Sequence, residues 1–216
     1  MALCLRIDLD YVPWDTPDAQ EFGHGEPAMV LKLMEFARHT GVKFHFFASN
    51  RVLRAFPATV DAVLNEGHDL DWLSKHPTED ERYEEAIKHF DGRGHALVGL
   101  AVRGEWPEGA ASPDQGLKFL SAFGKRAPEG LRLFPIETKG DREAARSGAT
   151  AKIWTDVVKK QVRDTAMRRS MLTVCLRPQV LAKFDPKLTH LREIVEIATV
   201  AQLPLRTLRD LISESP

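Results

Sequence analysis

Short apolar runs alternate with amphipathic stretches along almost the whole chain. Residues 3–11, LCLRIDLDY, are mostly apolar before two acids, which predicts a buried strand. Residues 27–40 then carry apolar side chains at helical spacing, and Gly41 predicts the helix end. The same criteria predict further strands at 42–48, 68–72, 96–102, 130–136, 149–154, 171–176 and 204–207, and helices at 50–66, 78–90, 113–123, 155–169, 188–201 and the end of the chain.

This alternation of strand and helix recurs about seven or eight times. It predicts an α/β protein in which a parallel sheet closes, or nearly closes, into a barrel with helices outside. No repeat or low-complexity linker divides the sequence, so we expect residues 1–216 to form a single barrel domain.

The charge and the cysteine content of the chain limit the kinds of partner and site that it can have. Acids and bases nearly balance, at a net charge of −1, which argues against nucleic-acid or anionic-membrane partners. Cys4 and Cys175 lie inside apolar runs and are expected to be buried thiols rather than a disulfide or zinc framework. The chain opens directly into a strand and has no long apolar segment, so we expect a soluble, cytoplasmic protein.

Two acids at the end of the first strand are the strongest signal for a site. Burying Asp8 and Asp10 is costly unless a cation or hydrogen-bond donors meet them. Ligands of parallel α/β folds bind at the carboxyl ends of strands, which favours a site here. The alternative is that both acids only cap a turn.

Polar side chains also follow the later strands: Asp71 and His76 after the third, Arg103, Glu105 and Trp106 after the fourth, and Arg177 after the seventh. Carboxylate plus imidazole is a ligand set for a divalent cation such as zinc, which converts bound water to a nucleophile. A second carboxylate could take the proton of that water, and an arginine could orient it. The alternative for His76-Pro77 is an ordinary turn.

Three tryptophans and two further histidines are also candidates for a functional or a structural role. Trp14, Trp72 and Trp106 follow strands, where they either stack on a sugar ring or pack in the core. We expect His45 to be structural and to face the helices, and His68 to be a buried histidine bonded to backbone.

The order of these pieces resembles the polysaccharide deacetylases of carbohydrate esterase family four, over nearly the whole chain. The matching segments are Ile7-Asp8-Leu9-Asp10, Phe44-His45-Phe46-Phe47, Gly67-His68, His76-Pro77 and the run from Arg103 to Pro107. The resemblance implies a distorted (β/α) barrel that hydrolyses an N-acetyl or O-acetyl group on a sugar polymer, or a related amide. It implies a divalent metal, zinc or similar, bound by Asp10 and His76, with Asp8 as catalytic base and Arg103 set against Asp8.

Two positions depart from the family pattern. Trp72 stands where the family has its first metal histidine, and an indole cannot ligate a metal, so Asp71 is the candidate third ligand. Arg177 stands where the family has the histidine that acts as general acid. An arginine stays protonated, so it can stabilise an oxyanion but donates a proton poorly.

Two hypotheses follow from these matches and departures. The first is a metal-dependent hydrolase of C–N or acetyl ester bonds, acting on a carbohydrate or a small amide. The second is a catalytically inactive barrel that binds a carbohydrate or a protein partner through the same mouth.

Overall fold

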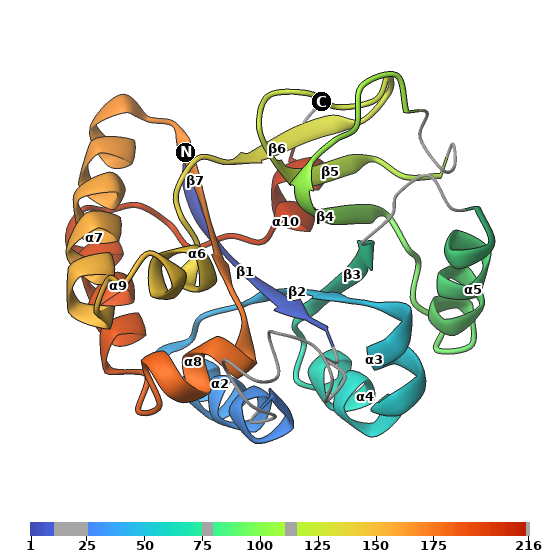
Figure 1. The fold of residues 1–216 in the computed structure, drawn as a ribbon, viewed down its shortest axis with the longest axis horizontal. Helices are drawn as coiled ribbons and strands as arrows, with labels where there is room; N and C mark the ends of the chain where they lie inside the picture. Colours follow the sequence, from blue (N-terminus) through green and yellow to red (C-terminus); the bar gives the residue numbers. More distant parts are fainter. Residues whose placement is uncertain (11–25, 75–79, 111–115, 215–216) are drawn as a thin grey trace.

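The computed structural model describes residues 1–10, 26–74, 80–110 and 116–214, and these residues contain one sheet of seven parallel strands. The sheet curls until its two outer strands approach each other, so it forms a nearly closed, distorted barrel (Figure 1). This confirms the predicted fold class. Across the sheet the strands are β6 (Arg132–Ile136), β5 (Phe119–Phe123), β4 (Gly99–Glu105), β3 (Asp69–Ser74), β2 (His45–Ala48), β1 (Ala2–Leu9) and β7 (Met171–Leu176).

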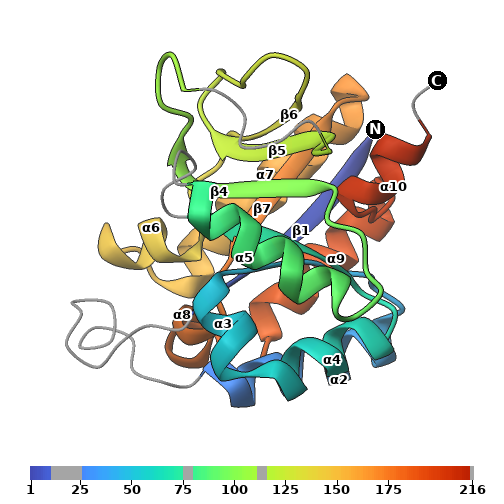
Figure 2. The same ribbon diagram turned by 90° about the vertical axis from the view of Figure 1, so that its right-hand side faces the viewer.

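Helices cover the outside of the barrel, and a short C-terminal helix lies against one end of it (Figures 1 and 2). The alternation of strand and helix in the sequence places most of them on the outer surface. The helices are α2 (Glu26–Thr40), α3 (Asn50–Ala55), α4 (Pro57–Asn65), α5 (Asp80–Asp91), α6 (Asp141–Arg146), α7 (Ala151–Arg168), α8 (Pro178–Phe184), α9 (Thr189–Val200) and α10 (Leu208–Ser213).

The two faces of β1 explain why the barrel forms. Leu5 and Ile7 belong to the apolar core beneath the helices, whereas Cys4, Arg6 and Asp8 point into the barrel, and all five are buried. Burial on both faces is typical of parallel strands. Full burial of each large apolar side chain contributes about 1.5–3 kcal/mol, so the outer core supplies most of the stabilisation. The barrel interior is where polar residues gather.

Two predicted elements were wrong. Residues 119–123, predicted as part of a helix, form β5, because the segment pairs on both sides, with β4 and with β6. Residues 149–154, predicted as a strand, contain the start of α7, where the Thr150 hydroxyl accepts a hydrogen bond from the backbone N–H of Ile153 at 3.3 Å. Both segments are short and apolar, and periodicity alone does not distinguish strand from helix in such runs.

The last predicted strand, residues 204–207, reduces to one parallel bridge between Leu205 and Leu3. The chain then enters α10, whose first turn is capped by Thr207 and Asp210 in a capping box. Of the helices that the structure describes, none has the length and apolar character needed to span a bilayer.

Candidate functional site

Asp8 lies inside the barrel and is fully buried against Arg6. The Arg6 guanidinium donates two hydrogen bonds to it, from Nε to Oδ1 at 2.6 Å and from Nη2 to Oδ2 at 3.0 Å. Arg6 also donates to the backbone carbonyls of Val102 and Ser121, so it ties β1 to β4 and β5 across the interior. Burial alone would raise the pKa of Asp8, but the charge and hydrogen bonds of Arg6 lower it below its ordinary value.

Asp10 follows β1 and is paired with a different arginine. The Nη2 atom of Arg103, on β4, forms an ion pair with Asp10 Oδ2, and Asp10 is only 1 % exposed. The resemblance placed Arg103 against Asp8, and the structure corrects this. Arg6 precedes Asp8 by two residues on the same inward face of β1, so it pairs with Asp8, and Arg103 meets the next carboxylate.

Arg177 lies at the end of β7 and is buried beside two acids. Its Nη1 atom is 3.3 Å from Glu143 Oε2 and 3.7 Å from Asp141 Oδ1, and its backbone N–H donates to Asp141 Oδ2 at 2.7 Å. Burial raises the pKa of Asp141 to about 7 despite the nearby Arg177 charge. The neighbouring acids hold Arg177 in its charged form, so the position that the family gives to a general acid carries a fixed positive charge.

Glu26, the first residue of α2, is a buried acid that the sequence analysis missed. Burial and the negative charge of Asp10 raise its pKa to about 8, while Arg103 acts in the opposite direction. In the sequence it resembles an ordinary acidic residue in a first helical turn, and nothing local distinguishes it. The mouth of the barrel therefore gathers Asp10, Glu26 and Arg103.

A cleft of about 250 Å³ opens beside Asp10, at the carboxyl ends of β1, β2 and β3. Asn50 organises one wall, because its Nδ2 atom donates to the Arg82 carbonyl at 2.6 Å and to Glu85 Oε2 at 3.0 Å. The Trp72 indole N–H donates to Asn50 Oδ1 at 2.8 Å. The lining residues are Asp10, Ser49, Asn50, Arg51, Arg54, Trp72, Leu73, Ser74, Arg82 and Glu85.

Two of the three tryptophans proposed to stack on a sugar can be placed. Trp72 is 1 % exposed, packs against Tyr83 with ring centroids 5.5 Å apart, and only borders the cleft. Trp106 is also buried, and its indole N–H donates to the Ala110 carbonyl at 2.9 Å. Both rings therefore pack within the protein. Trp14 lies outside the described residues, as does His76.

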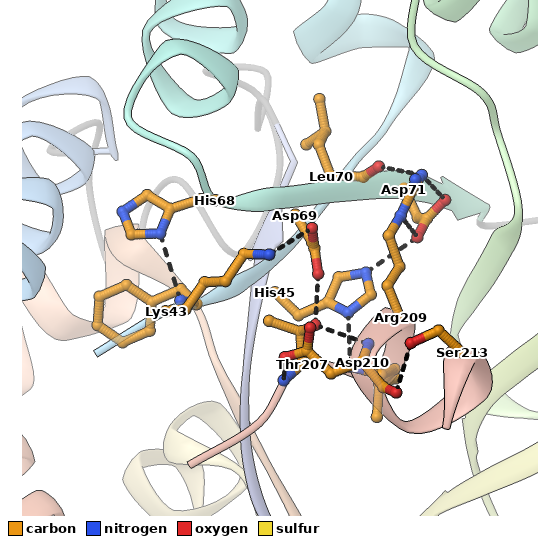
Figure 3. A network of polar contacts seen from close by, with 12 residues as sticks. Lys43, His45, His68, Asp69, Leu70, Asp71, Thr207, Arg209, Asp210 and Ser213 are labelled. Carbon is orange, nitrogen blue, oxygen red and sulfur yellow. Dashed lines mark hydrogen bonds and ion pairs between the residues drawn. The ribbon is translucent and has the colours of Figure 1, made fainter. Parts of the chain in front are cut away.

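Asp71 belongs to a separate polar network at the amino-terminal end of the barrel (Figure 3). Arg209 of α10 donates to both of its oxygens, Nη2 to Oδ1 at 2.7 Å and Nε to Oδ2 at 2.8 Å. His45 Nε2 lies 3.0 Å from Oδ2, and the N–H groups of Val98 and Gly99 donate to Oδ1. Because these donors occupy both oxygens, the described geometry does not place Asp71 with Asp10 as a metal ligand.

His45 faces the interior of the barrel, so the expectation that it faces the helices was wrong. Its ring stacks on Phe47, two residues on along the inward face of β2, with centroids 4.4 Å apart. Nδ1 accepts a hydrogen bond from the Leu208 N–H at 3.0 Å, which leaves the proton of the neutral ring on Nε2, facing Asp71. His45 thus joins β2 and β3 to α10, a structural role as expected.

Other contacts complete this network. Thr207 donates a hydrogen bond to Asp69, whose other oxygen lies 3.0 Å from Lys43 Nζ (Figure 3). His68 is buried and its Nδ1 atom accepts from the Phe44 N–H at 3.4 Å, which confirms that it bonds to backbone. The Thr207 hydrogen bond to Asp69 attaches the start of α10 to β3, and the hydrogen bond from the Leu208 N–H to His45 attaches it to β2.

A divalent cation needs several donor side chains close together. Within them, no three or more His, Cys, Asp or Glu side chains gather closely enough to hold a metal ion. Asp10 forms an ion pair with the Arg103 guanidinium, and Asp71 forms ion pairs with His45 and Arg209. A cation beside Asp10 would meet the like charge of Arg103 at short range, and His76, the other ligand that the resemblance implies, lies outside the described residues.

Solved structures with the same fold include hydrolases and a pseudoenzyme. The chain superimposes on the crystal structure of Puue allantoinase with a TM-score of 0.78, at 12 % identity, over 98 % of this chain and 89 % of that one. A probable polysaccharide deacetylase from Pseudomonas aeruginosa PAO1 gives 0.75, at 12 % identity, with the same coverage of 98 % and 89 %. A CE4 family pseudoenzyme from Bacillus anthracis gives 0.61, at 10 % identity, over 98 % of this chain and 65 % of that chain.

By sequence, the chain matches no protein-family model and no curated protein. The structural likenesses show that it has the polysaccharide deacetylase fold.

Proposed function

We propose that this chain is a polysaccharide deacetylase-fold protein that binds a carbohydrate at the mouth of its barrel without metal-dependent hydrolysis. The observation that carries the proposal is the ion pair between Arg103 and Asp10. A guanidinium stands beside the carboxylate that the resemblance assigns to the metal, and it stays protonated at every pH at which a protein is folded.

The surroundings of Asp8 and Arg177 also argue against hydrolysis. A general base must come within hydrogen-bond reach of the water it deprotonates, yet Asp8 is fully buried, its pKa is lowered, and both of its oxygens accept from Arg6. Arg177 retains its proton and cannot supply it to a leaving group. Asp8 and Arg177 therefore each keep a fixed charge, and neither is suited to transfer a proton.

The cleft supports a binding role. It lies at the carboxyl ends of β1, β2 and β3, the edge at which parallel barrels bind their ligands. Amide, hydroxyl, guanidinium and carboxylate groups line it, and these are the groups that hydrogen-bond to sugar hydroxyls. Named carbohydrate-active neighbours of the same fold favour a saccharide over other polar ligands.

A metal-dependent hydrolase of C–N or acetyl ester bonds is the second candidate. It is favoured by the position of Asp10, which borders the cleft at the end of β1, and by the hydrolases among the structural neighbours. This candidate requires His76 and a further donor beside Asp10, with Arg103 displaced.

Metal content and binding separate the two candidates. We expect purified protein to contain no stoichiometric zinc, cobalt, nickel or manganese by elemental analysis, and to gain no thermal stability when these ions are added. We expect N-acetylglucosamine oligomers to bind in titration calorimetry without release of acetate.

The decisive variants are Asp10→Ala and His76→Ala, with Asp61→Ala as the matched control. Asp61 also pairs with an arginine, Arg93 at 2.7 Å, but lies on the outer helix α4. Stoichiometric metal, together with acetate release that Asp10→Ala and His76→Ala abolish and Asp61→Ala preserves, would overturn the binding proposal in favour of the hydrolase.

A further inference from the structure

The outer face of α7 carries a stripe of exposed apolar side chains. Six large apolar residues are well exposed in the described part of the chain, and three of them, Ile153, Val157 and Met167, lie on this helix. At 3.6 residues per turn the three fall within an arc of about 80°, on the side of the helix away from its buried residues. Single exposed apolar side chains are ordinary, but a stripe along one helix marks a contact surface.

Two opposite charges lie inside this stripe. Lys160 and Asp164 fall within the same arc, between Val157 and Met167. Neither takes part in an ion pair within the described part of the chain, and they do not pair with each other although they are four residues apart. A partner that covers the stripe must therefore present apolar groups together with one charge of each sign.

A second copy of the same helix, running antiparallel, meets these requirements. Setting Val157 of one copy level with Met167 of the other places residue 162 at the two-fold axis. Lys160 then lies level with Asp164 of the other copy, because this pair is symmetric about the same residue. A register centred on residue 160 instead sets Lys160 level with its own copy, and Asp156 level with Asp164. Because that register brings like charges together, the charges favour the pairing about residue 162.

Helix α9 adds to the surface beside the end of α7. The two helices pack together, and Lys159 of α7 pairs with Glu193 of α9 at 2.8 Å. Both helices run toward the amino-terminal end of the barrel, where β7 and the Leu205 bridge follow them. Val200 lies seven residues beyond Glu193, and Met167 lies eight beyond Lys159, so the two lie at a similar level. Val200 is 77 % exposed and therefore adds apolar surface beside the end of the stripe.

The stripe lies on the far side of the barrel from the cleft. In Figures 1 and 2, α7 lies on one side of the sheet, and the helices α3 and α5 that line the cleft lie on the other. Helix α7 ends just before β7 begins, so it runs from the mouth toward the amino-terminal end of the barrel. Antiparallel pairing of α7 therefore points the two mouths in opposite directions and leaves both clefts open.

We propose that this chain forms a symmetric dimer in which two copies of α7 pack antiparallel, with residue 162 at the two-fold axis. The stripe is covered by the same stripe on a second copy, as a two-fold interface requires. The proposal is independent of carbohydrate binding. The stripe is about 21 Å long, and one helix pair of this length buries less than the roughly 1,600 Å² of a standard interface, so the dimer should be weak and reversible.

The first test measures the association of the full chain by sedimentation velocity over a range of concentrations. We expect a reversible equilibrium of monomer and dimer, in which Val157→Lys raises the dissociation constant about tenfold by placing a charge in the apolar contact. Leu31→Lys is the matched control, since Leu31 is 59 % exposed on α2 and Val157 is 51 % exposed on α7. The control should leave the dissociation constant unchanged.

Charge reversal tests the contact between Lys160 and Asp164. Lys160→Asp and Asp164→Lys should each weaken the dimer about tenfold, because each sets two like charges level with each other. The double variant restores opposite charges and should recover the dissociation constant of the wild type. The two residues also lie one turn apart in the same helix, so thermal unfolding of the dilute monomer is the control for effects within one chain.

Paired cysteines test the register of the two helices. Val157→Cys with Met167→Cys should give a disulfide-linked dimer under mild oxidation, because level positions of the pair lie within reach of a disulfide. The two positions are about 15 Å apart within one helix, too far for a bond inside one chain. Ile153→Cys with Met167→Cys, which suits the register centred on residue 160, should cross-link far less. The native thiols, Cys4 and Cys175, are buried.

Two kinds of result would contradict the proposal. A chain that stays monomeric at every concentration, or a dimer on which Val157→Lys and Leu31→Lys act equally, would overturn the role of α7. Stronger cross-linking of the pair 153 and 167 than of the pair 157 and 167, or a double charge variant that dimerises no better than the single ones, would overturn the antiparallel pairing about residue 162.

Discussion

The two ends of the barrel differ in what surrounds their buried carboxylates. At the amino-terminal end, Asp71 accepts hydrogen bonds from Arg209 and from two backbone N–H groups, and His45 lies against it. At the mouth, Asp10 pairs with Arg103 and borders an open cleft. The first arrangement holds the C-terminal helix in place, and the second faces the space that a ligand can enter.

Strand register alone does not separate these roles. Asp8 and Asp71 both lie opposite Phe47, one on each neighbouring strand, and both face the interior. Their partners nevertheless come from different parts of the chain: Arg6 from β1 itself, and Arg209 from α10. An acid within a barrel strand therefore takes its role from the groups that contact it.

Replacing Arg6 is expected to have the largest effect on stability, because Arg6 neutralises Asp8 in the buried interior of the barrel. Arg6→Met should lower the free energy of unfolding by about 3–5 kcal/mol, because Asp8 would remain as a buried charge without its guanidinium, with only the Cys175 thiol donating to it. Urea denaturation of the wild type and the variant measures this loss.

The double variant Arg6→Met with Asp8→Leu is the control. Replacing both members of a buried ion pair by apolar residues is often close to neutral, so the double variant should recover most of the stability. A double variant no more stable than the single one would contradict the pairing.

At the other end of the barrel, Arg209→Ala should cost about 2–3 kcal/mol, because it removes the donors to Asp71 and leaves that carboxylate under-satisfied. Arg206→Ala is the matched control, since Arg206 precedes α10 by two residues and pairs with Glu214 at 2.8 Å in an exposed position. Its loss should stay below about 1 kcal/mol. Equal losses in chemical denaturation would show that the Asp71 network does not anchor the helix.

The pH dependence of stability should have opposite signs at the two ends of the barrel. The pKa of Asp141, near the mouth, is raised from its ordinary 3.8 to about 7. Its contribution to stability is present below pH 3.8 and is lost as the pH rises to 7. The pKa of Asp71 is lowered, because hydrogen bonds from His45 and the charge of Arg209 outweigh burial. Its contribution is present above pH 3.8 and is lost as the pH falls below that value.

Asp141→Asn and Asp71→Asn test these signs when their free energies of unfolding are compared with the wild type between pH 3 and 8. The deficit of Asp141→Asn should shrink as the pH rises, and that of Asp71→Asn should shrink only toward the acid end. Parallel curves for the two variants would remove the distinction between the ends.

Much of the fold could be predicted because its signals are local. The apolar run of residues 3–9 and the helical spacing of residues 27–40 depend only on neighbours in sequence, and both elements formed. The errors at residues 119–123 and 149–154 arose where a short apolar run suits either element, and the choice depended on pairing with β4 and β6 or on the Thr150 cap.

The candidate site was less predictable. The sequence predicted Asp10 and Arg103 as site residues but paired Arg103 with Asp8. It gave no sign that Glu26 would be buried beside Asp10. Asp71 was a candidate because it stands next to Trp72, where the family has a metal ligand. Adjacent residues of a strand face opposite sides of the sheet, so Trp72 lies in the core beneath the helices and Asp71 lies inside the barrel.

The sequence by itself determined the alternation of strands and helices, the two acids at the end of β1, and the arginines at the positions that the resemblance gives to the partner of the base and to the general acid. Only the tertiary structure decided which arginine meets which carboxylate. The pairs Arg103–Asp10 and Arg209–Asp71 join residues 93 and 138 positions apart, and they depend on how far the sheet curls and on where α10 docks. Local sequence cannot encode either distance, because both are set by the packing of the whole barrel.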